Sequence, residues 1–533
     1  MQGKLKIVLI LFCAILLRCC VTFHPHSGEG EPPMYGDYEA QRHWQEITLN
    51  LPVNEWYTNT TDNDLQYWGL DYPPLTAYHS LLLGHIANIV DPSFVRLHES
   101  RGIETVAHKH FMRLTVLLAD ILTYIPAVAY FAMNLCLCER LQIKKSRDCD
   151  KFGTRCLVLM TALIYPGLII IDHGHFQYNC VSLGLLVAAA ATLTRNSFAF
   201  SSVLFVLALN YKQMELYHAL PFFFYVLGTY RRRSWNYRGF VGLTGVSLTV
   251  LATFCVIWMP FLRSRDSLVS AVLRLFPFAR GVFEDKVANV WCAINVVYKL
   301  RETFTNAELA RICLAATTCA VAPSCAHLYR SPGRDAFVVS LINSALAFFL
   351  FSYQVHEKSI LLAAVPVLLH FHNDPLPCFW FLLISSFSML PLFIKDDLYL
   401  VYVLTMAIYF IAVSWMWPDM FDKDEAASGR NRNESEGSRR RFVARNKERG
   451  ISSHLPGYFK RSWLLAVFYL SLSGALILSV GSRCVKPPER YPDLFPLLVS
   501  VYSCGHFLIF FLYFNYVQLS ASGRNCGKCV KYE

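Results

Sequence analysis

The chain has 533 residues, of which 54% are hydrophobic and only 16% are charged, and its mean hydropathy is +0.35. Soluble domains carry roughly 25% charged residues, so this composition excludes an ordinary soluble protein and predicts an all-helical polytopic membrane protein. The net charge of +11 is a modest excess and requires no nucleic-acid partner.

Apolar runs that could cross a bilayer, which takes about 20 helical residues, recur along the whole chain. The first run follows Lys4 and Lys6, and it is interpreted as a retained signal anchor because no clear small-residue cleavage site lies near Cys20. In chain order, the fourteen predicted spans cover residues 5–23, 113–137, 156–171, 180–194, 198–210, 216–230, 239–262, 308–329, 335–353, 359–371, 376–393, 397–417, 462–480 and 494–517.

The distribution of Lys and Arg over the connecting segments predicts which side of the membrane each segment faces. With the N-terminus in the cytoplasm, the cytoplasmic segments hold 29 of these residues and the opposite side holds 17, in agreement with the positive-inside rule. Both termini are then cytoplasmic, and the long segments 24–112 and 262–307 face the lumen. The first of these is acidic, with 12 Asp or Glu against 4 Lys or Arg, whereas the second carries 7 basic residues.

The predicted spans divide the chain into eight segments. The Ser-, Glu- and Asn-containing loop 418–461 has the composition of a disordered linker, and the pair Cys526 and Cys529 in the tail is a weak zinc signal because no second pair accompanies it. The segments are a first anchor at 1–23, a luminal loop at 24–112, spans at 113–261, a second luminal loop at 262–307, spans at 308–417, a basic cytoplasmic loop at 418–461, the last two spans at 462–517 and a cytoplasmic tail at 518–533.

Polar clusters in an apolar membrane protein are costly to bury, and they are therefore candidates for function. The first cluster follows the first span and contains Asp37, Glu39 and Arg42. Its carboxylates could supply a general base, a metal ligand or a charged binding face. The alternative is structural, because acidic residues favour a helix N-terminus and Arg42 lies within reach of either carboxylate.

Three further clusters fall on the predicted luminal side. Asp71 lies in an aromatic, proline-rich stretch that suits a sugar ring or, alternatively, anchors the membrane interface. His175 and Gln177 lie between two spans, where hydrogen bonding is favoured over metal binding because no third ligand is spaced beside the histidines.

Basic side chains at predicted luminal helix ends complete the set. Lys212 lies at one luminal turn, and His356 and Lys358 lie at another. Charge-assisted donors of this kind suit a phosphate group. Because the sequence contains no Walker or Rossmann pattern, these clusters favour a lipid-borne phosphate donor over a soluble nucleotide.

At these residues the sequence resembles the endoplasmic-reticulum glucosyltransferases that use dolichyl-phosphate glucose, a family with the GT-C membrane fold. The resemblance favours the branch that adds the first glucose to the lipid-linked oligosaccharide over the sister branch that adds the second, which lacks the long second string. The matching strings are GDYEAQRHW (36–44), YWGLDYPPLTAYHS (67–80), HFQYN (175–179), NYKQMELY (210–217), ARGVFEDKVANVWC (279–292) and QVHEKSIL (354–361).

The resemblance implies an inverting transfer of glucose from dolichyl-phosphate glucose to the terminal mannose of a dolichyl-diphosphate oligosaccharide, forming an α-1,3 bond. Asp37 is expected to be the base and Asp71 to support it, while His356 and Lys358 hold the donor phosphate. No metal and no cofactor are expected, and no obligate protein partner is evident beside the two lipid-linked substrates and the membrane lipids. The other residues expected to bind substrate or to support the base are Glu39, Arg42, His175, Gln177 and Lys212.

Two other classes of protein remain open from the residues alone. A transporter of lipid-linked sugars would also have many spans, although the sequence shows no internal repeat of the kind such proteins usually carry. A structural subunit of a glycosylation complex would not need Asp37, His356 and Lys358 together. The sequon at Asn59 lies in the predicted luminal loop and is expected to carry a glycan, whereas the sequon at Asn433 lies in the predicted cytoplasmic loop.

Overall fold

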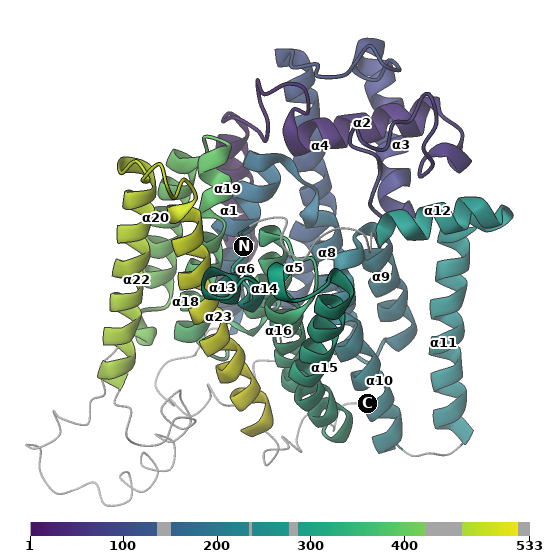
Figure 1. Cartoon of the computed structure of the whole chain (residues 1–533). Helices are drawn as coiled ribbons and strands as arrows, with labels where there is room; N and C mark the ends of the chain where they lie inside the picture. The colour runs from purple at the N-terminus through teal and green to yellow at the C-terminus, as the bar shows by residue number, and fades with distance from the viewer. Residues whose placement is uncertain (1, 136–150, 234–236, 277–285, 422–460, 521–533) are drawn as a thin grey trace, which may run out of the picture.

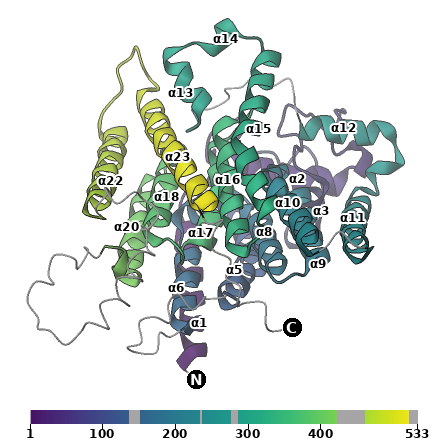
Figure 2. The same ribbon diagram turned by 90° about the horizontal axis from the view of Figure 1, so that it is seen from below.

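The computed structural model describes residues 2–135, 151–233, 237–276, 286–421 and 461–520, and the regular structure within these ranges is entirely helical. Most of the long helices run side by side in one bundle, while α2 lies across its upper part and α12 lies across the upper end of α11 in the view of Figure 1. The helix α11 stands at the edge of the bundle and packs against α9 (Figure 2).

The helices of the described residues follow one another in chain order. The first part contains α1 (Gln2–Thr22), α2 (Gly36–Asn50), α3 (Pro74–Val90), α4 (Val106–Leu122), α5 (Tyr124–Met133), α6 (Lys151–Leu163), α7 (Pro166–Ile169), the π-helical segment η4 (Ile170–Phe176), α8 (Asn179–Leu193), α9 (Phe198–Tyr211), η5 (Gln213–His218), α10 (Ala219–Arg233), α11 (Tyr237–Trp258) and α12 (Arg265–Leu275). The second part contains α13 (Val290–Val297), α14 (Leu300–Thr303), α15 (Asn306–Arg330), α16 (Arg334–Phe351), η7 (Glu357–Ile360), α17 (Leu361–His370), α18 (Pro375–Ser388), α19 (Leu390–Lys395), α20 (Tyr399–Met416), α22 (Arg461–Cys484) and α23 (Leu494–Ser520).

Each of the fourteen predicted spans contains a helix of the structure. Within the described residues, eight helices are long and apolar enough to cross a membrane, and a ninth crossing results if the bent pair Phe152–Leu163 and Pro166–Phe176 counts as one span. The other predicted spans contain the shorter helices α8, α9, α10, α17 and α18. The prediction of a polytopic helical membrane protein is therefore confirmed, whereas the number of crossings and the GT-C fold stay predictions.

The segment 24–112, predicted as a luminal loop, is itself folded and forms a small layer over the bundle. Pro74 occupies the first turn of α3, where its missing N–H costs nothing. Trp56 and Ala271 belong to one buried apolar cluster that joins this layer to the second predicted luminal segment. Arg274 of α12 also donates from Nη2 to the carbonyl oxygen of Gly69 at 2.8 Å. The acidic and basic segments are therefore in direct contact.

Some sequence predictions lie outside the described residues. These are most of the loop 418–461, which includes Asn433, and the end of the tail, which includes Cys526 and Cys529.

A buried ionic group fixes the π-helical segment η4 inside the bundle. Arg18 of α1 donates from Nε to Oδ2 of Asp120 on α4 at 2.5 Å, and Nε2 of His173 lies 2.9 Å from the same oxygen. All three side chains are buried. Charged groups at such positions are expensive unless they are paired, so this group holds α1, α4 and η4 in one arrangement.

Candidate functional site

A cluster of polar side chains from distant parts of the sequence surrounds the carboxylate of Asp37 in the first turn of α2. Its Oδ2 accepts hydrogen bonds from Nε2 of Gln177 at 2.6 Å and from Nζ of Lys358 at 2.5 Å. The same oxygen lies 2.9 Å from Nε2 of His175. None of these three contacts involves Oδ1. One carboxylate oxygen therefore joins α2, the end of η4 and η7.

A second carboxylate lies on the far side of His175. The other ring nitrogen, Nδ1, is hydrogen-bonded to Oδ2 of Asp396, the residue that follows α19. The side chains of His175 and Asp396 are each only 2% exposed, whereas that of Asp37 is 23% exposed. The three groups thus form a row that runs from a partly open carboxylate to a fully enclosed one.

The Asp37–Lys358 contact is an ion pair. Burial alone would raise the pKa of the Asp37 carboxyl, but Lys358 and His175 outweigh burial and hold this pKa well below its usual value. Burial would likewise lower the pKa of Lys358, but Asp37 and the adjacent Glu357 raise it above its usual value. Both groups are therefore charged at neutral pH in the absence of a ligand.

The backbone before α2 brings Asp37 to the π-helical segment. The amide N–H of Ser27 donates to the carbonyl oxygen of His175 at 3.0 Å, and the amide N–H of Asp37 donates to Oγ of Ser27 at 3.3 Å. Gly36 has a φ of 65°, and a Cβ there would lie 2.6 Å from the backbone of Ser27. A side chain at residue 36 would therefore separate Asp37 from its partners.

Left-handed backbone conformations mark each of the four segments that meet in this cluster. Non-glycine residues with positive φ are Tyr35 before Asp37, Phe176 after His175, Gln354 before Lys358 and Asp397 after Asp396. Such conformations cost roughly 1–3 kcal/mol each and tend to collect at functional sites. The chain keeps four of them within four residues of the side chains that they help to place, which supports a functional role for the cluster.

Lys212 lies next to this cluster and lines a small cleft. Its Nζ donates to Oδ1 of Asn179 at 2.5 Å and lies 5.2 Å from the centre of the Tyr72 ring. Burial, followed by repulsion from Lys358, lowers the pKa of Lys212 to about 8. The cleft joins residues from four of the matching strings, and its lining consists of Gln41, Tyr72, Thr76, Gln177, Tyr178, Tyr211 and Lys212.

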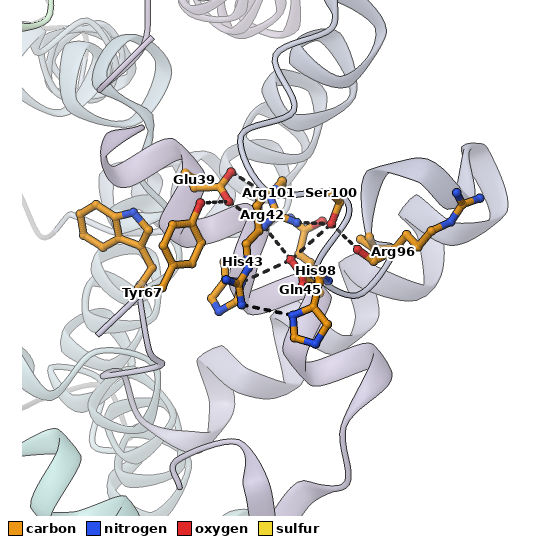
Figure 3. A network of polar contacts seen from close by, with 12 residues as sticks. Glu39, Arg42, His43, Gln45, Tyr67, Arg96, His98, Ser100 and Arg101 are labelled. Atoms are coloured by element: carbon orange, nitrogen blue, oxygen red, sulfur yellow. Dashed lines mark hydrogen bonds and ion pairs between the residues drawn. The ribbon is translucent and has the colours of Figure 1, made fainter. Parts of the chain in front are cut away.

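Glu39 and Arg42 belong to a different network on α2 (Figure 3). Arg42 is fully buried and donates to both oxygens of Glu39 at 2.8 and 2.6 Å, to Glu46 at 2.7 Å and to Ser100 at 2.6 Å. The hydroxyl of Tyr67 also donates to Glu39 at 2.8 Å. The ion pair expected in the structural alternative is therefore present between Glu39 and Arg42, whereas Asp37 lies in the first turn of α2 but pairs with other segments.

The Arg42 network also fixes the ionisation of Glu46. Burial would raise the pKa of Glu46, but His43 and Arg42 lower it to about 2. Ionised Glu46 also accepts from the backbone N–H of His98 at 2.8 Å. This part of α2 is therefore an electrostatic anchor for the connection between α3 and α4.

Asp71, His356 and Asn59 were also singled out from the sequence. The carbonyl oxygen of Asp71 accepts from Nε2 of Gln213 at 3.0 Å, which fixes the second string beside the Lys212 turn. His356 is exposed and precedes η7 by one residue. Asn59 is exposed, and its side-chain oxygen accepts from the backbone N–H of Leu65 at 3.2 Å.

Sequence reasoning singled out Asp37, His175, Gln177 and Lys358, and the structure brings all four into contact. It missed Asp396. The only signal for that residue is the run Lys395–Asp396–Asp397 between two apolar stretches, which is also typical of an exposed loop.

The apolar helices and the Asp37 cluster together define a polytopic membrane protein with a polar site built from its connecting segments. The chain belongs to the ALG6, ALG8 glycosyltransferase family, whose model matches residues 14–513. It is 44% identical to the dolichyl pyrophosphate Man9GlcNAc2 alpha-1,3-glucosyltransferase of Gallus gallus, over 97% of each chain. It is also 44% identical to the protein of the same name from Rattus norvegicus, over 99% of this chain and all of the rat chain, and 43% identical to that of Mus musculus, over 97% and 98%.

Proposed function

We propose that this protein transfers glucose from dolichyl-phosphate glucose to the terminal mannose of a dolichyl-diphosphate-linked Man9GlcNAc2 oligosaccharide, forming an α-1,3 bond. The acceptor and the linkage are those in the names of the chicken and rat relatives. The observation that carries the proposal for this chain is the pairing of a partly open carboxylate, Asp37, with a buried cation, Lys358. In this proposal the site faces the lumen of the endoplasmic reticulum.

The reaction requires one proton acceptor. Because the donor is β-linked and the product is α-linked, the acceptor hydroxyl attacks C1 of glucose from the face opposite the phosphate. A bond forms between O3 of mannose and C1 while the bond from C1 to the phosphate oxygen breaks. Asp37 takes the proton of the attacking hydroxyl, and the phosphate oxygen leaves with the electron pair, so that the leaving group needs no protonation.

Oδ1 of Asp37 is the oxygen that suits this role, since the three contacts with Gln177, His175 and Lys358 all use Oδ2. These contacts hold the carboxylate in one orientation before substrate arrives. Preorganisation of this kind lowers the cost of aligning the base at the moment of reaction.

Lys358 is the group that suits the donor phosphate. It is charged, its side chain is only 19% exposed, and a buried ammonium stabilises the negative charge that develops on a departing phosphate. His356 lies two residues away and, being exposed, is placed to contact the phosphate from the entrance side. Lys212, Gln177 and Gln41 line the adjacent cleft and offer donors to the sugar hydroxyls.

The sister reaction, addition of the second glucose, is the second candidate, because the family includes both branches. The names of the relatives with 43–44% identity over nearly the whole chain favour addition of the first glucose.

The proposal is tested with the purified full-length protein in detergent or nanodiscs. Dolichyl-phosphate glucose and dolichyl-phosphate mannose are each offered with glycolipid acceptors that carry no glucose or one glucose. We expect transfer only from the glucose donor and only to the unglucosylated acceptor. Transfer to the monoglucosylated acceptor alone would assign the protein to the sister reaction, and transfer of mannose would contradict the proposed donor.

The same assay tests the base. Asp37→Asn keeps the shape of the side chain but cannot take a proton, so we expect turnover to fall by about 10² or more. Asp71→Asn should cost less, because Asp71 is proposed only to support the site. Full activity of a folded Asp37→Asn protein would contradict the assignment.

A further inference from the structure

We infer that Asp396 is a positioning residue that acts on Asp37 through His175, an inference that rests on the proposed function and deepens it. The three side chains form one row, in which Nε2 of His175 lies 2.9 Å from Asp37 and Nδ1 is hydrogen-bonded to Asp396. Asp396 is enclosed behind the imidazole and is only 2% exposed. It therefore has no direct access to the substrate, and its hydrogen bond to His175 is the contact that connects it to Asp37.

Asp396 is the middle residue of a run of three charged residues, and the local structure buries only its side chain. Lys395 and Asp397 are exposed, whereas Asp396 is buried. Asp397 has a φ of 56°, and the amide of Leu398 donates to the carbonyl oxygen of Phe393 at 2.7 Å, so a tight turn directs the middle side chain inward. Two of the three charged side chains are thus exposed to solvent, and only that of Asp396 is buried.

The π-helical segment is shaped to meet this turn. A Cβ on Gly174 would lie 3.1 Å from Cδ1 of Leu398, so the absence of a side chain lets η4 approach the turn closely. His175 follows directly, and its own carbonyl oxygen is held by Ser27. Backbone and side chain of His175 are both fixed, the first from the α2 side and the second by Asp396.

A carboxylate behind a histidine has a defined chemical effect. A carboxylate that carries no proton only accepts hydrogen bonds, so a His175 ring that donates from Nδ1 to Asp396 and from Nε2 to Asp37 carries a proton on both nitrogens. The ring then keeps one orientation, with Nε2 directed at Oδ2 of Asp37 and 3.1 Å from Nζ of Lys358. With Oδ2 held in this way, the carboxylate presents Oδ1 to the acceptor hydroxyl.

Asn at residue 396 would remove this control while keeping the size of the side chain. Its amide is neutral and offers N–H as well as C=O to the imidazole, so it no longer holds the proton on Nδ1 that lets the ring donate from Nε2 to Asp37 as well. We expect Asp396→Asn to lower kcat by about 10- to 100-fold, the range known for losing a carboxylate that orients a metal-bound histidine. The KM values for donor and acceptor should stay within about twofold, because Asp396 touches neither substrate.

A double-mutant cycle separates this role from general support of the fold. Gln in place of His175 can still donate an amide N–H to Asp37, but it has no second ring nitrogen for Asp396 to control. In the His175→Gln background, Asp396→Asn should therefore change kcat by less than about threefold. The same fold loss in both backgrounds, or a rise in KM with kcat unchanged, would overturn the inference.

Asp397→Asn is the matched control, since it alters the adjacent, exposed carboxylate and Asn tolerates a positive φ. Its kcat and thermal stability should equal those of the wild type. If Asp396→Asn does not fold, Asp396→Glu replaces it in the same cycle, because Glu keeps the charge but displaces the carboxylate by one methylene. An active Asp37→Asn protein would overturn the base, whereas equal effects in both backgrounds with Asp37→Asn inactive would overturn only the role of Asp396.

Discussion

Asp37 has two demands on it that conflict in the ligand-free protein. A general base works best when its pKa lies near the working pH, but the ion pair with Lys358 and the contact with His175 hold the Asp37 pKa well below its usual value against the effect of burial. A donor phosphate that binds Lys358 would compete with Asp37 for the same ammonium group. Occupation of the donor site would then make Asp37 a stronger base just when a base is needed.

Competition for Lys358 predicts that losing the Asp37 carboxylate strengthens the binding of the donor phosphate, whereas a general disruption of the site would weaken it. Asp37→Asn removes the carboxylate that occupies Lys358, so the variant should bind dolichyl phosphate more tightly than the wild type, by about fivefold or more. Direct binding of dolichyl phosphate to the purified protein in nanodiscs measures this difference. Asp397→Asn should bind like the wild type, and unchanged or weaker binding by Asp37→Asn would show that Lys358 does not exchange partners.

The sequence predicted which residues belong to the site better than it predicted which side chains contact each other. Asp37, Glu39 and Arg42 lie within one helical turn and a half, and spacing alone did not reveal that Glu39 and Arg42 pair with each other while Asp37 faces another segment. Asp396 was missed because its burial depends on a turn and on the close approach of Gly174, neither of which leaves a pattern in the sequence.

Helix packing around the site depends on a few points of close backbone contact. A Cβ on Gly184 of α8 would lie 2.7 Å from the backbone nitrogen of Tyr124, at the junction of α4 and α5. Small residues at such contacts allow helices in membranes to approach closely. Since α8 begins just after His175 and Gln177, its position against α5 also fixes the end of η4.

This contact predicts different effects of the same substitution at two glycines. Gly184→Ala places a methyl group against backbone atoms that have little room to move, so we expect a loss of about 1–3 kcal/mol of stability. Gly245→Ala on α11 meets no atom within 4 Å and should leave stability unchanged or slightly higher. Thermal melting of both purified variants in the same detergent checks the prediction, and equal melting temperatures would contradict it.

The helices of the structure follow the apolar runs of the sequence. The breaks within two of these runs were not predicted. The predicted span 156–171 is divided before Pro166, where the helix axis bends by 40°, and the predicted span 376–393 is divided between α18 and α19. Proline removes a hydrogen-bond donor and favours such breaks. Hydropathy records only how apolar a run is, and so it could not show where the run bends or that residues 170–176 form a π-helix.

At the scale of the whole molecule, the predicted topology places the Asp37 cluster and the segment 24–112 on one side of the membrane. Eight of the described helices are long and apolar enough to cross a membrane, and the distribution of Lys and Arg over the loops predicts that the Asp37 side faces the lumen. The two sequons, at Asn59 and Asn433, fall on opposite sides in this topology.

Glycan analysis of these two residues tests the topology. We expect a glycan on Asn59, which is exposed, and none on Asn433. Glycosidase treatment should then reduce the apparent mass of the wild type, and Asn59→Gln should abolish this reduction. A glycan on Asn433 would contradict the predicted number of crossings between the two residues.

The contacts of Asp37 also set a time at which the site can first exist. Its partners His175 and Lys358 follow it by 138 and 321 residues. At about 5–20 residues per second, the ribosome needs about 15–65 s to add Lys358 after Asp37 has been made. Until then the nascent chain holds a carboxylate without its ammonium partner, and a product of premature termination before η7 never acquires it. Completion of the site is therefore a late event of synthesis, after most of the helical bundle has already entered the membrane.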